Sequence, residues 1–155
     1  MYQDYFESPI GLIEIRANDS AVTALDFCKQ RGATVPHPLL EKAIEQLSEY
    51  FKGERQLFDL KIETNGTAFQ NSVWRELLNI PYGHTCSYFD IAQKIGNPKA
   101  VRAVGAANGK NPIALIVPCH RVIGSNGTLT GYAGGLDRKA WLLQHEAATG
   151  FALCP

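Results

Sequence analysis

The stretch that decides the fold is SYFDIAQKIGNPKAVRAVGAANGK, residues 87–110. Apolar residues recur at helical spacing in its first part, where Ser87 and Asp90 have the spacing of a capping box. GNP at 96–98 is a turn signal, and a second segment of helical composition follows it. Two helices joined by a short Gly-containing turn form the helix-turn-helix pattern. The stretch therefore predicts a helix-turn-helix.

The second helix of this pair is rich in Ala and Gly, and Arg102 is its only long interior side chain. In DNA-binding helix-turn-helix proteins the second helix enters the major groove, where Asn, Gln, Arg and Lys read the bases. Small residues let the backbone approach a duplex closely without reading its sequence. The helix thus predicts duplex docking with little base specificity, and ordinary packing of an Ala-rich helix is the alternative.

Two further helices are predicted on either side, over residues 67–80 and 136–149. Thr67 and Gln70 have capping-box spacing at the start of the first. The second is expected to bury one apolar face, made of Leu136, Ala140, Leu143 and Ala147.

The N-terminal part has a different pattern. Apolar residues nearly alternate over residues 4–18, with SPIG as a turn, and a third strand is predicted over 21–28, so this part forms an antiparallel meander. A helix is predicted over 39–51, and QLFDLKIE at 56–63 predicts one more strand.

We place a domain boundary in the polar, turn-rich TNGT at 64–67. The predicted class is α+β. An N-terminal domain, 1–66, contains a small antiparallel sheet with a helix, and a C-terminal domain, 67–155, is mostly helical and winged-helix-like. The first has 7 basic and 11 acidic residues, a net charge of −4, and the second has 8 and 4, a net charge of +4. Either a locally basic face for nucleic acid or an unevenly charged solvated surface explains this asymmetry.

Composition excludes several classes of protein. No apolar run approaches the length of a membrane span, and the start has neither the basic nor the apolar region of a signal peptide. The four cysteines form no CxxC pair, which argues against a disulfide framework or a local zinc site. We therefore expect reduced thiols in a cytoplasmic protein.

LIVPCHRVIG at 115–124 contains the candidate nucleophile, Cys119, after an apolar run that we interpret as a rigid core segment. A reactive cysteine needs thiolate character and access. His120 follows it, although adjacent side chains usually point apart, so their pairing needs a special turn or a bridging water. Glu146 is a candidate to orient the histidine, which would complete a Cys–His–acid arrangement. An inert core thiol is the alternative.

PCHRV at 118–122 is preceded by GNPKAVRAVGAANGKNP and followed by GYAGGLDRKAWLLQHE. This combination resembles the alkylguanine-DNA alkyltransferases, also called methylated-DNA–protein-cysteine methyltransferases, most densely over residues 68–147. The resemblance implies repair of alkylated guanine at its 6-oxygen, and less well of thymine at its 4-oxygen. The nucleotide is flipped out of the duplex, and the alkyl group moves irreversibly to a cysteine, once per molecule and without a cofactor.

The resemblance also implies catalytic roles. Cys119 accepts the alkyl group, His120 acts as the base through a bridging water, Glu146 orients the histidine, and Asn111 supports the turn at the site. The implied partner is double-stranded DNA with an alkylated guanine or thymine, bound by a monomer, with no membrane involved.

Binding roles follow by the same resemblance. Arg102 would fill the space left by the flipped nucleotide, on a docking helix that also presents Ala103 and Gly105. Tyr88 would stand against the 3′ phosphate and donate a hydrogen bond to the base. The remaining pocket residues would be Val122, Tyr132 and Ala133. The carbonyls of Val122 and Cys119 would accept hydrogen bonds from the base amine. Tyr132 would line the pocket at the alkyl group, and the amide of Ala133 would meet the 6-oxygen.

Some features depart from parts of the family. Position 133 is Ala where some relatives have Ser. Some relatives bind a structural zinc in the N-terminal domain through Cys and His. Here Cys28 and His37 are the only Cys or His residues before position 84, so we predict no zinc. Two rival functions remain: a damage-binding protein that transfers nothing, and a cysteine hydrolase with a distant histidine such as His145. The first needs no thiol, and nothing in the sequence indicates the second.

Overall fold

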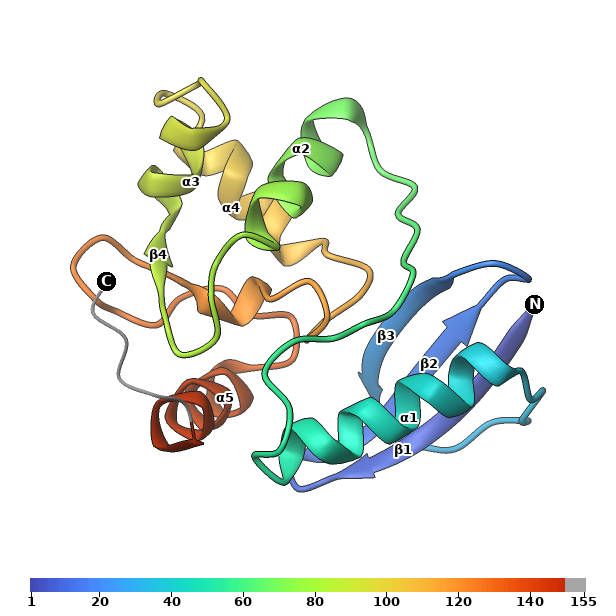
Figure 1. Ribbon diagram of the computed structural model, residues 1–155. Coiled ribbons are helices and arrows are strands. Elements are labelled where there is room, and N and C mark those ends of the chain that lie inside the picture. Colours follow the sequence, from blue (N-terminus) through green and yellow to red (C-terminus); the bar gives the residue numbers. More distant parts are fainter. Residues whose placement is uncertain (150–155) are drawn as a thin grey trace. The chain divides into compact units, whose positions relative to one another are not determined.

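The computed structural model describes residues 1–149 and divides into two compact units, Met1–Thr64 and Asn65–Pro155 (Figure 1). This division falls two residues before the boundary placed from the sequence. Within the described residues, no helix has both the length and the apolar character needed to cross a membrane.

The first unit is a three-stranded antiparallel sheet in the order β1-β2-β3 with one helix packed on it. The elements are β1 (Tyr2–Ser8), β2 (Gly11–Ala17), β3 (Val22–Cys28) and α1 (Pro38–Phe51). Pro at the first turn of α1 is favourable because its missing N–H would have no helical partner there. The core of this unit includes Ile13, Ile15, Leu25, Leu40 and Leu47.

The strand predicted over residues 56–63 does not form. Ile62 pairs with Val22 in a single parallel bridge, flanked by hydrogen bonds of 2.9 Å from Val22 N to Lys61 O and 3.0 Å from Glu63 N to Val22 O. The segment makes a single bridge to the sheet edge, which is too little to make a ladder.

The second unit contains four helices within the described part of the chain: α2 (Ala68–Leu77), α3 (Tyr88–Lys94), α4 (Val101–Gly109) and α5 (Leu136–Thr149). Both predicted capping boxes are present, at the starts of α2 and α3. Helices α3 and α4 pack against each other and form the predicted helix-turn-helix, with Gly96 at φ 81° in the turn between them (Figure 1).

A short parallel pair, β4 (Cys86–Ser87) and β5 (Val122–Ile123), links the start of α3 to the cysteine motif. Between α4 and β5 the chain forms a 3-10 helix, η1 (Cys119–Arg121). The apolar run before η1 is buried, as expected of a core segment, and it consists of turns, with Leu115 at φ 70°.

The face predicted for α5 is wrong. Leu136 is 48% exposed and Ala147 is exposed, whereas the buried residues of this helix are Lys139, Leu142 and Glu146. These three lie at helical spacing on one side. Apolar periodicity failed here because two of the inward positions carry charged groups that belong to the site.

Candidate active site

The backbone around Cys119 is held by side chains at the end of α4. Cys119 N donates to Val117 O at 2.8 Å, which closes a tight turn. Asn111 Nδ2 donates to the same Val117 O at 2.8 Å, and Asn108 Nδ2 donates to Cys119 O at 3.3 Å. Only 5% of Cys119 is exposed. Two asparagines three residues apart therefore fix the peptide groups on both sides of the turn that presents the thiol.

Glu146 joins His120 and Arg121 in a buried network. His120 Nε2 lies 2.6 Å from Glu146 Oε2, and Arg121 donates through Nε to Oε1 at 2.8 Å and through Nη2 to Oε2 at 3.0 Å. Gly83 N adds a longer bond to Oε1 at 3.3 Å, and Arg121 Nη1 donates to Ile80 O at 2.8 Å. His120 and Glu146 are 0% and 1% exposed, so solvent screens these interactions little.

Burial and charge set the protonation states of this network. Burial alone would raise the pKa of Glu146, but its partners hold that pKa well below its usual range. The largest effect comes from His120, through its hydrogen bond and, in acid where the imidazole is protonated, through its charge, and the hydrogen bonds and charge of Arg121 follow. Burial lowers the pKa of His120, against the opposing effect of Glu146. We therefore assign a carboxylate to Glu146 and a neutral imidazole to His120 at neutral pH.

The two nitrogens of the His120 ring are in different situations. Nε2 is engaged with Glu146, which as a carboxylate accepts the Nε2–H. Nδ1 is buried and has no hydrogen-bond partner among residues 1–149. A neutral imidazole that donates through Nε2 carries its lone pair on Nδ1. Nδ1 is therefore the ring nitrogen with a lone pair available to accept a proton.

Tyr88, at the start of α3, is joined to the Gly-rich loop at 124–135. Its hydroxyl donates to Thr130 O at 3.0 Å, and Lys139 Nζ donates to the same oxygen at 2.7 Å. Tyr132 is half-buried and Ala133 is exposed further along this loop. The structure thus brings Tyr88 to the loop that carries Tyr132 and Ala133, two of the predicted pocket residues.

Helix α4 divides into an inner and an outer face. Arg102 and Ala103 are exposed on the outer face, and Val104, Ala107 and Asn108 are buried. A Cβ built at Gly105 would lie 3.9 Å from the ring of Tyr88, which is ordinary van der Waals contact, so this position lies beside α3. Val122, the last of the predicted residues, is fully buried in β5.

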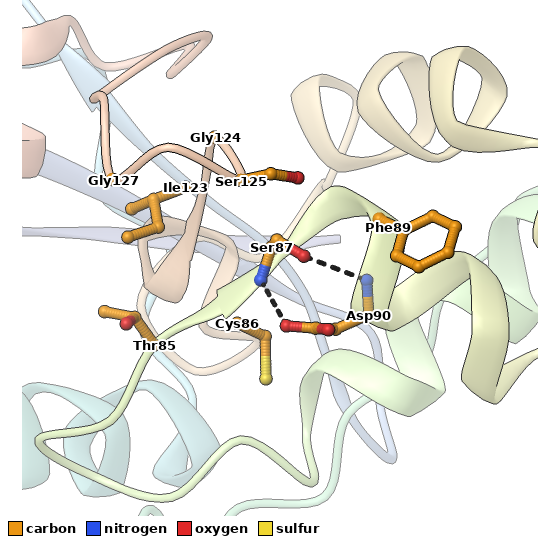
Figure 2. Close-up of a pocket in the computed structure, with 9 residues that line it drawn as sticks. All are labelled: Thr85, Cys86, Ser87, Phe89, Asp90, Ile123, Gly124, Ser125 and Gly127. Atoms are coloured by element: carbon orange, nitrogen blue, oxygen red, sulfur yellow. Dashed lines mark hydrogen bonds between the residues drawn. The ribbon is translucent and has the colours of Figure 1, made fainter.

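A separate pocket of about 410 Å³ lies where β4 and the start of α3 meet the loop after β5 (Figure 2). Figure 2 shows Ser87 and Asp90 joined by the reciprocal bonds of the α3 capping box. The pocket is not lined by Cys119, His120 or Glu146. The one carboxylate among its lining residues, that of Asp90, is hydrogen-bonded in the cap of α3. We assign it no part in the chemistry.

Three residues of the site were not predicted from the sequence. They are Arg121, Asn108 and Lys139. The signal available for Lys139 was its spacing of seven from Glu146, which places both on one side of α5. Nothing local in the sequence indicates the amide of Asn108.

A helix-turn-helix with one exposed arginine, together with a buried cysteine followed in the chain by a buried His–Glu–Arg network, defines a DNA-binding protein with a candidate cysteine nucleophile. Family models cover nearly the whole chain: the 6-O-methylguanine DNA methyltransferase DNA-binding domain matches residues 68–148, and the ribonuclease-like domain of the same proteins matches residues 1–64. The chain belongs to the methylated-DNA–protein-cysteine methyltransferase family.

Individual relatives agree with this assignment. The methylated-DNA–protein-cysteine methyltransferase of Methanosarcina barkeri is 51% identical over 153 residues, covering 94% of this chain and 97% of the relative. That of Haemophilus influenzae is 42% identical over 94% of this chain and 86% of the relative. The crystal structure of Mycobacterium tuberculosis OGT in complex with DNA matches with a TM-score of 0.89 and 48% identity, covering 98% and 96% of the two chains.

Proposed function

We propose that this chain repairs DNA by transferring a methyl or other alkyl group from the 6-oxygen of guanine, and less well from the 4-oxygen of thymine, to Cys119. Each molecule acts once, because a thioether is not reversed by the groups of this site. The observation that carries the proposal is the buried His120–Glu146–Arg121 network beside the thiol. An inert core cysteine requires no such network.

In this mechanism His120 acts as a general base. Glu146 holds Nε2, so Nδ1 takes the thiol proton, through a bridging water because neighbouring side chains diverge. The Cys119 thiolate then attacks the alkyl carbon in a single displacement. The sulfur–carbon bond forms, the carbon–oxygen bond breaks, and the departing guanine takes up the proton. Asn108 and Asn111 fix the turn, so the sulfur needs little reorganisation.

Docking on DNA uses the outer face of α4. A guanine 6-oxygen is hidden in a duplex, so the nucleotide must be extruded before transfer. Arg102 is exposed on α4 and is suited to fill the space left in the stack, and Ala103 beside it lets the backbone come close. Tyr88, Val122, Tyr132 and Ala133 then line the pocket. We also propose that the protein acts as a monomer in the cytoplasm, where thiols stay reduced.

Mass spectrometry tests the proposal directly. After incubation with a duplex containing one 6-O-methylguanine, the peptide with Cys119 should gain one methyl group, in an amount equal to the lesions repaired. Cys119→Ser should bind the duplex and transfer nothing, and Cys86→Ala, which changes another thiol of the same unit, should transfer as the wild type does. Binding without methylation in the wild type would instead support the damage-binding alternative, and repeated turnover would contradict an irreversible acceptor.

A further inference from the structure

Lys139 is the most unusual residue of the site that the proposed mechanism does not use. It is 0% exposed in the first turn of α5. A buried ammonium is strongly unfavourable without a compensating charge or hydrogen bonds. The other buried charges nearby compensate each other, since Arg121 is paired with Glu146. Lys139 forms no ion pair with a carboxylate among residues 1–149.

The contacts of the ammonium are polar but not anionic. Lys139 Nζ donates to Thr130 O at 2.7 Å, and it lies 5.9 Å from the centroid of the Tyr88 ring. A carbonyl dipole and the negative face of an aromatic ring both favour a cation. Neither supplies the full negative charge that a buried ammonium normally has as its partner.

The acceptor thiol supplies such a charge. Helix α5 packs against η1, which begins at Cys119. Burial lowers the pKa of Lys139, and the thiolate form of Cys119 opposes this and raises it. The same ammonium lowers the pKa of His120, after the larger effects of burial, Glu146 and Arg121, so its charge also favours the neutral imidazole.

The other charged groups around Cys119 are already paired. On η1, His120 and Arg121 are engaged with Glu146 of α5. Helix α2 also packs against η1, and its buried residues are uncharged: Val73, Trp74 and Leu77. From α3 and the Gly-rich loop, Tyr88 and Tyr132 contribute phenol side chains, which supply no positive charge. This leaves Lys139 as the cation available to the thiolate among the described residues.

We propose that Lys139 is a positioning residue of the transfer reaction whose buried ammonium is the counter-charge of the Cys119 thiolate. This inference rests on the proposed function of Cys119 as the acceptor. When the thiol proton moves to His120, the negative charge that forms on the sulfur has its counter-charge in a fixed cation on α5, the helix that packs against η1. When the sulfur–carbon bond forms and the carbon–oxygen bond breaks, the electron pair leaves with guanine, which takes the proton, and the sulfur becomes neutral.

The test is the pH titration of Cys119 itself, followed by thiolate absorbance as the difference between each protein and its Cys119→Ser version. Lys139→Met keeps the length of the side chain and removes the charge, and it should raise the midpoint by about one pH unit or more, since a close opposite charge shifts a pKa by about 1–3 units. Lys139→Arg keeps the charge and should stay near the wild type. Lys110→Met, an exposed lysine in the same unit, makes the same change in net charge and should not shift the midpoint.

A reciprocal measurement does not depend on how well the Lys139 variants fold. Cys119→Ser removes the thiolate, so the pKa of Lys139, followed by NMR of its labelled side-chain nitrogen, should fall relative to the wild type. The inference is overturned if Lys139→Met is folded and its Cys119 thiol titrates at the wild-type midpoint. It is also overturned if the pKa of Lys139 is the same in Cys119→Ser as in the wild type. Both titrations are done without DNA, so a failure of methyl transfer to Cys119 in the wild type would be recognised separately as failure of the proposed function.

Discussion

Replacing Glu146 by glutamine should destabilise the second unit strongly. The carboxylate is 1% exposed and accepts two hydrogen bonds from Arg121, at 2.8 and 3.0 Å. An amide removes the negative charge and turns one acceptor into a donor, so the buried guanidinium loses its counter-charge. Removing one partner of a buried ion pair costs about 3–5 kcal/mol. This is a large part of the roughly 5–15 kcal/mol that stabilises a protein of ordinary size.

Thermal and urea unfolding measure this loss. For a protein of this length, about 2–4 °C of Tm is lost per kcal/mol, so a fall on the order of 10 °C is expected. Asp137→Asn removes one negative charge from the exposed first turn of the same helix and should cost less than about 1 kcal/mol. The contrast between the two variants separates the buried pair from a general charge effect.

A double variant tests whether the uncompensated charge of Arg121 causes the loss of stability in Glu146→Gln. Adding Arg121→Met to Glu146→Gln removes the uncompensated charge and should recover part of the stability. The reasoning is wrong if the double variant loses as much unfolding free energy as the two single variants together. It is also wrong if the unfolding free energy of Glu146→Gln lies within about 1 kcal/mol of the wild type.

The same network predicts a dependence on pH. Because the folded pKa of Glu146 is held below its ordinary value of about 4.3, its contribution is complete above that pH and is lost as the pH falls below it. The difference in stability between the wild type and Glu146→Gln should therefore shrink in acid. A difference that stays constant from neutral pH to well below 4 would contradict a paired carboxylate.

Further predictions concern binding and transfer. Arg102→Ala should slow repair of duplex DNA at least tenfold, with little effect on dealkylation of the free base, whereas equal losses in single-turnover assays would remove its role in the duplex. DNA affinity should fall as salt rises, with little dependence on sequence around the lesion, and a salt-independent affinity by fluorescence anisotropy would exclude docking through the basic face. Because burial lowers the pKa of His120, methyl transfer should persist below its ordinary pKa of about 6.5, and a rate profile with its midpoint above that value would assign the base elsewhere. Asn108→Leu removes the hydrogen bond to Cys119 O and should cost about 1–3 kcal/mol in unfolding experiments, unlike Asn97→Leu in the exposed turn before α4.

Local signals in the sequence were sufficient for most of the fold. The three strands and the helix-turn-helix follow from alternation, capping boxes and turn residues, each of which acts within a few positions of the chain. The strand predicted over 56–63 failed because a strand needs a partner edge along its length, and the segment pairs with β3 through a single bridge between Ile62 and Val22. The properties of the segment alone do not contain that information.

The site was predictable in outline and not in its electrostatics. PCHRV and the final helix indicated Cys119, His120 and Glu146, and the structure joins the last two at 2.6 Å. Arg121 pairs with the same carboxylate because η1 turns the Arg121 side chain inward. No signal in the neighbouring sequence indicates this direction.

Helix α5 shows why periodicity fails where function lies. A helix with an ordinary core contact buries leucines and exposes charges. Here the inward positions of α5 include Lys139 and Glu146, so a hydrophobic pattern assigned the wrong face. Buried charges weaken a core unless each has a partner. Glu146 is paired with His120 and Arg121, and Lys139 donates a hydrogen bond to Thr130 O, with the Cys119 thiolate as its proposed counter-charge. A helix that violates its own amphipathic pattern with charged residues seven apart is therefore a signal of an active site rather than of a weak core.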